Sequence, residues 1–315
     1  MVDSSLPARL NAVRRLGYRL LGDRFGYLLH TRPAEWPIMT AHTVVGYLLA
    51  VGWSGAAGGE RLGPAALGVA LWVIGLNGGT LALNSAFDRD IGDIGYLRAP
   101  PPVPRHLAAF GVALMVGGLG LALTLPWAYG IAYAACAVMS VAYSVPPLRL
   151  KAVAGADWLI NMIGFGSLTP FAGFASTGRP LEPSQGLVLL AFCPLFAALY
   201  PLTQLYQFEE DRQRGDRTLA LILGMGRSLQ VAVLSAAGAF GLFFAAGLRA
   251  GWRLGDGDLF RWGGLVLAAV SWGSVLLPWL AGHELMTTEE HQRGMYRALA
   301  SWAATDVVVV LAWGT

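Results

Sequence analysis

Acidic residues gather in two short segments of an otherwise apolar chain, and each segment follows a long hydrophobic run. The first spans residues 84–93 and the second spans residues 207–219. Together they hold seven of the chain's 19 acidic residues. Carboxylates at the end of a membrane helix are costly unless a cation satisfies them. Because Mg²⁺ takes oxygen ligands and usually shares its coordination shell with phosphate, the two segments predict a magnesium site for a phosphorylated substrate.

The composition predicts an all-α integral membrane protein. Of the 315 residues, 55% are hydrophobic and 13% are charged. The apolar residues form runs at or near the length of about 20 residues that crosses a bilayer as a helix, rather than the short alternating segments of a membrane β-barrel. We expect nine transmembrane helices, near residues 37–55, 63–86, 106–125, 127–144, 156–177, 184–207, 227–248, 261–282 and 295–313.

Positive charge is distributed unevenly among the segments that connect these runs. The N-terminal tail and the connections that follow even-numbered runs hold 17 of the 22 Lys and Arg residues. By the positive-inside rule this side faces the cytoplasm. We therefore expect a multi-pass protein of the inner (cytoplasmic) membrane with a cytoplasmic N-terminus and both acidic segments on that side. The basic residues flank membrane segments, so no nucleic-acid partner is expected.

Residues 1–36 contain six Arg residues but no early apolar core, so they do not resemble a signal peptide. Leu and Val residues at helical spacing instead predict an amphipathic helix on the inner leaflet. A poorly ordered basic tail is the alternative. We divide the chain into this cytoplasmic segment, residues 1–36, and a nine-helix membrane domain, residues 37–315.

Polar residues follow one face of each helix that leads into an acidic segment. The spacings repeat at seven and eleven residues, which places the side chains on the same side of an α-helix. The two sets are Asn77, Asn84 and Asp88, and Tyr200, Gln204, Gln207 and Asp211. Polar faces of membrane helices point into the bundle, so the two sets predict a central cavity with a polar mouth. The alternative is interhelical hydrogen bonding by Asn and Gln.

A third segment on the same side, residues 143–151, follows the fourth run. Pro146 and Pro147 end the helix, and Arg149 and Lys151 follow. Taken alone, these two cations are typical of side chains that anchor a helix at the membrane surface. Beside two acidic segments they become candidate diphosphate ligands, because Arg offers a bidentate fork and Lys a point charge.

The three segments together resemble the motifs of UbiA-type intramembrane prenyltransferases, a superfamily with nine helices and two Asp-rich motifs. The first family motif is Asn-Asp-x-x-Asp-x-x-x-Asp. Asn84 and Asp88 match it, whereas Ser85 and Gly92 replace its other two acids. The family commonly has Arg-Pro near residues 101–102, where this chain has Pro-Pro. The resemblance therefore implies that Arg98 or Arg105 replaces that arginine.

The second family motif is Asp-x-Glu-x-Asp-(x)3-Gly-x-x-Thr-Leu. Gln207 replaces its leading Asp, and the remaining positions match at Glu209, Asp211, Gly215, Thr218 and Leu219. The Tyr-Ser-x-Pro-Pro-x-Arg-x-Lys pattern of residues 143–151 resembles the branch that contains chlorophyll synthases and the menaquinone and archaeal-lipid prenyltransferases.

This resemblance implies Mg²⁺-dependent transfer of an isoprenyl group from a polyprenyl diphosphate to a hydrophobic acceptor, aromatic or lipid-like, within the membrane. The implied catalytic residues are Asp88 and Asp211. The implied metal ligands are Asp88, Asp90, Asp93, Glu209, Glu210 and Asp211. The implied substrate-binding residues are Asn84, Arg98, Arg149, Lys151, Tyr200, Gln204, Gln207 and Arg217.

Other functions fit the same pattern. A UbiA-type terpene cyclase would ionise the same kind of donor, and a non-catalytic isoprenoid-binding homologue would keep the fold without turnover. Secondary transporters are also built from repeated helices, but their polar binding residues lie midway through the membrane. The acidic segments of this chain instead follow the ends of the runs. The sequence leaves the donor length, the acceptor and the oligomeric state open.

Three further polar residues lie within the apolar runs. Asp306 falls near the middle of the ninth run, and it is either a proton acceptor or acceptor contact, or a neutral carboxyl bonded to a neighbouring helix. Asp157 lies near the start of its run, which favours an interfacial role. We expect His42 to be a hydrogen-bonded histidine inside the bundle.

Overall fold

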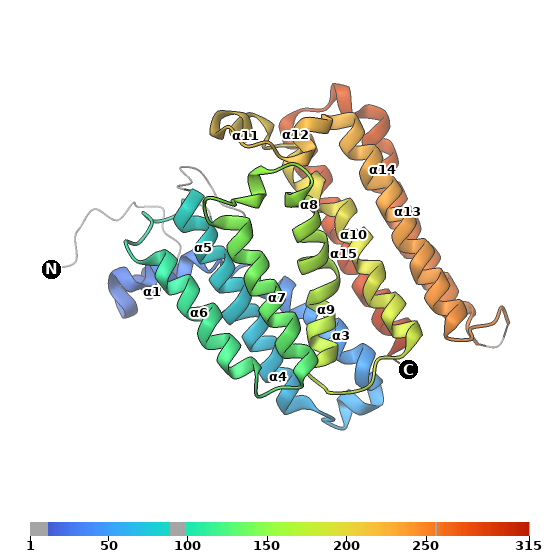
Figure 1. The fold of residues 1–315 in the computed structure, drawn as a ribbon. Helices are drawn as coiled ribbons and strands as arrows, with labels where there is room; N and C mark the ends of the chain where they lie inside the picture. The colour runs from blue at the N-terminus through green and yellow to red at the C-terminus, as the bar shows by residue number, and fades with distance from the viewer. Residues whose placement is uncertain (1–11, 89–96, 98, 256, 315) are drawn as a thin grey trace.

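The computed structural model describes residues 12–88, 97, 99–255 and 257–314, except for the side chains of Glu209, Glu210 and Arg214. The chain forms a bundle of α-helices (Figure 1). Across the described ranges no β-strand is present, and one isolated bridge joins Val153 to Arg217. The predicted all-helical class is therefore confirmed.

Six helical segments are long and apolar enough to span a membrane. They are Leu62–Asp88, Ala156–Ala175, Pro183–Gln204 (α10), Met225–Arg249 (α13), Leu259–Leu285 and Thr288–Trp313 (α15). Two short helices, α11 (Phe208–Arg214) and α12 (Leu219–Leu223), precede α13. The segment Leu259–Leu285 consists of α14 (Leu259–Gly282) and the 3₁₀ turn His283–Leu285.

The three other predicted runs are also helical. They form α3 (Trp36–Ala57), α6 (Leu107–Ala122) and α7 (Trp127–Ser144). These helices do not meet the criteria of length and apolar content that the other six satisfy. The chain is thus a multi-pass membrane protein, and the count of nine spans stays a prediction.

Two spanning segments contain a π-helical turn. The segment Leu62–Asp88 runs as α4 (Leu62–Ala70), the π turn Leu71–Asn77 and α5 (Gly78–Asp88). The segment Ala156–Ala175 runs as α8 (Ala156–Asn161), the π turn Met162–Leu168 and α9 (Thr169–Ala175). Because π turns place residues five apart on one face, these two insertions determine which side chains of each segment point inward.

Two clusters of buried apolar side chains flank the centre of the bundle. One joins α10, α13, α14 and α15, and it includes Phe192, Phe243 and Trp272. The other joins the π turn Leu71–Asn77 to α6, α7 and α9, and it includes Trp72 and Tyr133. In Figure 1 α1 (Ala12–Leu21), α5 and α6 lie on one side of the bundle and α13 and α14 on the other. Each half is thus packed on its own core.

Close backbone contact joins α3 to α9. A Cβ atom added at Gly46 would overlap the carbonyl oxygen of Pro170, and one added at Gly173 would overlap the carbonyl oxygen of Thr43. Glycine is required at both positions, because small residues let membrane helices approach this closely.

The N-terminal helix α1 (Ala12–Leu21) keeps apolar side chains exposed, with Val13 and Leu20 each 73% exposed. Arg14 Nη1 donates to the carbonyl oxygen of Ala99 at 3.1 Å, which ties α1 to the connection that follows the first acidic segment. An amphipathic helix with one tethered basic side chain fits the predicted position on the inner leaflet. That location stays a prediction.

We predict that Gly46→Ala lowers the melting temperature of the purified protein, because the added methyl group meets backbone rather than a movable side chain. The expected loss is about 1–3 kcal/mol, as for other overpacked sites. Gly238→Ala in α13 is the matched control, since no heavy atom lies within 4 Å of the added Cβ. Equal melting temperatures for the two variants in the same detergent would contradict the close α3–α9 contact.

Candidate active site

A cavity of about 910 Å³ lies between the two apolar clusters. Its walls come from α3, α5, α7, α8, α10 and α15 and from both π turns. One end carries charged and amide side chains, and we call this end the mouth. The other end, which we call the floor, carries mainly aromatic and apolar side chains. The mouth includes Asn84, Asp88, Lys151, Gln204, Gln207, Asp211 and Asp216.

The C-terminal end of α5 places Asn84 and Asp88 one helical turn apart at the mouth. Lys151 forms an ion pair with Asp88, and its Nζ donates to Asn84 Oδ1 at 3.0 Å. Asp88 is also 3.8 Å from Arg149, measured from Oδ1 to Nη2. The first acidic segment and the segment of residues 143–151 are therefore joined by charge.

Arg149 connects the first acidic segment to the second. Its Nη1 donates to Asp216 Oδ1 at 2.7 Å, while its Nη2 faces Asp88. The backbone of Arg149 is left-handed, with φ of 35°, a conformation that residues other than glycine rarely adopt and that recurs at functional sites. Nearby, Arg217 N donates to the carbonyl oxygen of Ala152 at 3.3 Å. The structure thus brings all three predicted segments together.

Tyr200 and Gln204 lie one turn apart on α10 and take part in a buried hydrogen-bond network. Tyr143 and Tyr200 hydroxyl oxygens are 3.0 Å apart, and Gln204 Nε2 donates to Tyr200 at 3.2 Å and to Asp157 Oδ2 at 3.3 Å. Gln204 Oε1 is buried without a hydrogen-bond partner. Because Gln204 itself lines the cavity, this unpartnered oxygen is a candidate to accept a ligand's hydrogen bond or to coordinate a cation.

Asp157 is fully buried in the first turn of α8, and its expected interfacial role stays a prediction. Its carboxylate accepts from Gly155 N at 2.9 Å and from Leu219 N at 3.2 Å, in addition to Gln204. Asp157 therefore holds together α8, α10 and the start of α12. Only its place at a helix N-terminus could have signalled this role.

The cavity accounts for part of the predicted site. Asp88, Asn84, Lys151, Tyr200, Gln204, Gln207 and Asp211 line it. Arg149 contacts lining residues from outside, and the Arg217 side chain is exposed and does not line the cavity. Asp90, Asp93 and Arg98, together with the side chains of Glu209 and Glu210, lie outside the described residues.

Three charged residues that line the cavity were not assigned a role from the sequence. Arg32 and Glu35 precede α3, and Nη1 of Arg32 is 3.5 Å from Oε1 of Glu35. Burial raises the pKa of the Glu35 carboxyl, and the nearby Arg32 charge opposes that rise. Asp216, which follows α11, also lines the cavity. Arg32 and Glu35 lie outside the acidic segments, and Asp216, although within the second one, falls outside the helical spacing that ends at Asp211, so spacing alone did not single them out.

The mouth offers oxygen ligands of the kind that Mg²⁺ takes. Over the part of the chain that the structure describes, no three His, Cys, Asp or Glu side chains are placed to hold a metal by themselves. Mg²⁺ usually needs only one or two carboxylates together with substrate phosphates. Asp88, Asp211 and the unpartnered Oε1 of Gln204 meet that requirement chemically.

The family of the chain follows from comparison with known proteins. The model of the UbiA prenyltransferase family matches residues 39–281, so the chain belongs to that family. The predicted resemblance is confirmed. A digeranylgeranylglyceryl phosphate synthase of Natronomonas pharaonis is 32% identical over 48% of this chain and 54% of its own length. The chain thus matches about half of that curated relative.

Other relatives and solved structures agree with the family. A lycopene elongase/hydratase of Halobacterium salinarum is 28% identical over 65% of this chain and 74% of its own length. A UbiA homolog of Archaeoglobus fulgidus, solved with DMAPP and Mg²⁺, superposes with a TM-score of 0.62 at 17% identity, over 90% of this chain and 98% of that one. A structure described for a digeranylgeranylglyceryl phosphate synthase gives a TM-score of 0.67 at 14% identity, over 91% and 97%. These structures share the fold.

We predict that Asp157→Asn destabilises the protein by about 1–3 kcal/mol, because an amide NH₂ would face groups that already donate. Leu219 N and Gln204 Nε2 both donate to Oδ2, whereas Gly155 N donates to Oδ1, so neither amide orientation satisfies all three. Thermal melting of the purified variant measures the effect. Glu284→Gln is the control, since its side chain is exposed. A melting temperature for Asp157→Asn equal to that control would rule out the anchoring role.

Proposed function

We propose that the chain is a prenyltransferase that moves an isoprenyl group from an isoprenyl diphosphate to a hydrophobic acceptor within the membrane. The observation that carries this proposal is one cavity whose mouth combines carboxylates with Lys151, with Arg149 paired to two of those carboxylates from outside, and whose floor is aromatic. A molecule with a diphosphate head and a long apolar tail matches both ends of that cavity.

The cations at the mouth would bind the diphosphate. Lys151 and Arg149 are held by Asp88 and Asp216, so their positions are set before a ligand arrives. A diphosphate placed against them would gain charge-assisted hydrogen bonds, bidentate in the case of arginine. The same contacts would stabilise the pyrophosphate as the donor's C–O bond breaks, because negative charge then grows on the leaving group.

Carboxylates and amides at the mouth would complete the diphosphate site. Asp88 and Asp211, with the oxygen atoms of Asn84 and Gln204, would hold Mg²⁺ in contact with the diphosphate. Bound there, Mg²⁺ supplies charge stabilisation to the leaving pyrophosphate. Asp157 would act indirectly, by fixing the orientation of Gln204. Asp90, Asp93, Glu209 and Glu210 stay proposed as additional ligands.

The interior of the cavity would protect the allylic cation that ionisation produces. Phe196 and Trp302 line the cavity below Tyr200, and their rings are 5.5 Å apart, edge to face. Aromatic faces attract cations, and a closed apolar chamber keeps water from reacting with them. The cation would alkylate the acceptor, which then releases a proton. The departing pyrophosphate is a base beside that carbon and can take it.

The relatives support an isoprenoid donor and an apolar acceptor. They include digeranylgeranylglyceryl phosphate synthases and lycopene elongase/hydratases, and the Archaeoglobus fulgidus homolog was solved with DMAPP, with GPP and with Mg²⁺. We propose an inner-membrane location with the mouth and the N-terminus on the cytoplasmic side, in keeping with the 17 of 22 Lys and Arg residues on that side.

Pyrophosphate release tests the proposal. Purified protein is incubated with geranyl, farnesyl, geranylgeranyl and longer diphosphates, with and without Mg²⁺, and with membrane lipid extract as acceptor. We expect Mg²⁺-dependent release that is lost in Asp88→Ala and in Asp211→Ala. Extraction of the lipid product then separates transfer from cyclisation of the donor alone. Folded protein that releases no pyrophosphate from any donor would indicate a non-catalytic isoprenoid-binding homologue.

We predict that Lys151→Met lowers kcat about 10²–10³-fold, as for removal of other groups that stabilise developing negative charge. Lys151→Arg should retain more activity, because it keeps the positive charge. Arg253→Gln is the control, since Arg253 is an exposed arginine between α13 and α14. If steady-state rates of pyrophosphate release were the same for Lys151→Met and Arg253→Gln, Lys151 would have no part in ionisation.

A further inference from the structure

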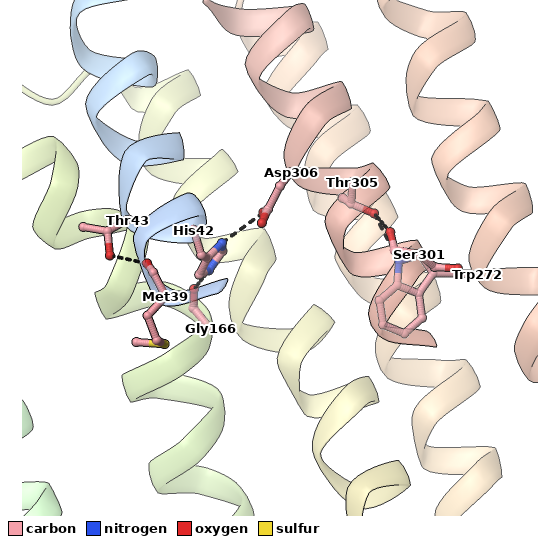
Figure 2. Close-up of polar contacts among 8 residues, drawn as sticks. All are labelled: Met39, His42, Thr43, Gly166, Trp272, Ser301, Thr305 and Asp306. Carbon is pink, nitrogen blue, oxygen red and sulfur yellow. Dashed lines mark hydrogen bonds and ion pairs between the residues drawn. The ribbon is translucent and has the colours of Figure 1, made fainter. Parts of the chain in front are cut away.

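A buried histidine–aspartate pair joins α3 to α15 at the floor of the cavity. His42 Nδ1 is 3.0 Å from Asp306 Oδ1, and His42 Nε2 is 3.2 Å from the carbonyl oxygen of Gly166 (Figure 2). His42 is 3% exposed and Asp306 is 9% exposed. Three segments distant in sequence therefore meet at one imidazole ring.

The two hydrogen bonds determine the charge of this pair. A carbonyl oxygen only accepts, so Nε2 of His42 carries a proton and donates to Gly166. The bond between Nδ1 and Asp306 then holds one shared proton, whether it lies on the ring or on the carboxyl. In both cases the pair is neutral overall. Both ring nitrogens are thus engaged within the protein, so neither has a free lone pair to take a proton from a bound acceptor.

His42 lies where the cavity ends. Its ring lines the cavity, whereas Asp306, one turn beyond Trp302 on α15, does not. The imidazole ring contacts Trp302 edge to face at 4.9 Å and Phe192 at 4.8 Å between ring centres. Phe196 and Trp72 complete the floor. The floor residues lie within their helices, whereas Asn84, Asp88 and Gln204 of the mouth lie in the last turns of α5 and α10. A chain that extends from a diphosphate at Lys151 therefore runs toward this floor.

The packing around His42 leaves the floor rigid. Thr43, the next residue, bonds within α3 through Oγ1 to the carbonyl oxygen of Met39 at 2.7 Å, and its own carbonyl oxygen closely approaches Gly173 of α9. On α15, Trp272 Nε1 donates to Thr305 Oγ1 at 3.1 Å (Figure 2). Because α3 and α15 are each fixed to a neighbouring helix, the imidazole ring cannot move aside without breaking several contacts.

From this geometry we propose that His42, held by Asp306, determines the longest isoprenyl chain that the cavity accepts from the donor. The inference rests on the proposed function and adds a specificity-determining residue to it. An imidazole ring and one isoprene unit are similar in size, so removing the ring would make room for one more unit. The hydrogen bonds to Asp306 and Gly166 keep the ring across the end of the cavity, where it meets the last unit of the chain.

The test compares two double variants that both remove the charged pair. His42→Ala with Asp306→Ala deepens the cavity, whereas His42→Phe with Asp306→Leu keeps it filled. Because each removes both members of the pair, neither leaves an isolated buried charge, and both lose the same hydrogen bond to Gly166. We compare kcat/KM for the donor that the wild type prefers with kcat/KM for a donor one isoprene unit longer. In the deepened variant we expect the ratio of the longer to the preferred donor to rise roughly tenfold or more. The filled variant should keep the wild-type preference.

A binding measurement separates this proposal from the proposed function. Thermal shifts with unreactive thiolodiphosphate analogues of increasing chain length report chain fit without turnover. If neither the wild type nor any variant releases pyrophosphate, the proposed function fails. A longer optimal analogue chain for the deepened variant would still support the proposal that His42 limits chain length. If folded wild-type protein and the deepened variant had the same optimal analogue chain length, the proposed role of His42 would be overturned. Should that variant not fold, Phe196→Leu enlarges the floor from α10, and an unchanged optimum there would also overturn the proposal.

Asp306→Asn tests the remaining alternative, that the pair takes the acceptor's proton. Asn is similar in shape to Asp but cannot share a proton with His42 in the same way. We expect this variant to keep the ratio of prenylated product to released pyrophosphate, even if it melts at a lower temperature. Normal pyrophosphate release with loss of prenylated product would instead identify the pair as a base and overturn its assignment as a floor.

Discussion

The contact of Arg149 with both Asp216 and Asp88 is the interaction on which the mouth of the cavity depends. It joins three connections that follow different helices, and each alone would carry a charge that an apolar bundle tolerates poorly. An arginine between carboxylates satisfies all of them. The same arrangement keeps Lys151 in the cavity wall and Arg149 directly behind it, so the charges that hold the connections together also lie at the proposed phosphate site.

The sequence predicted the helices well because membrane helices depend mainly on apolar length. Each of the nine apolar runs falls on helix, and α7 begins and ends at the residues predicted, 127 and 144. Where helices cross was not predictable, since it depends on close backbone approach. Gly46 and Gly173 are two of 41 glycines, and nothing in their local sequence marks them as the contact between α3 and α9.

The sequence placed residues on the cavity wall correctly where helical periodicity applied. Asn84, Asp88, Gln204 and Asp211 all line the cavity, as expected from their spacing. Prediction was weaker in the connections, where backbone geometry rather than periodicity aims the side chain. Arg217 was expected to bind diphosphate but its side chain is exposed, while Asp216, the residue before it, lines the cavity. The contacts of Asp157 depend on three segments and had no local signature.

Because of the two π turns, the shape of the cavity depends on how many residues each turn contains as well as on which residues they are. In one turn Trp72 and Asn77 both line the cavity; in the other Gly164 does, as does Thr169, which directly follows that turn, and each pair is five residues apart. Trp72 Nε1 donates to Thr169 Oγ1 at 3.2 Å, which joins the two turns. Losing one residue from either turn would rotate the rest of that helix by about 100°. Insertions and deletions here are therefore far more damaging than conservative substitutions, and relatives that differ in length at these turns should differ in the wall of their cavities.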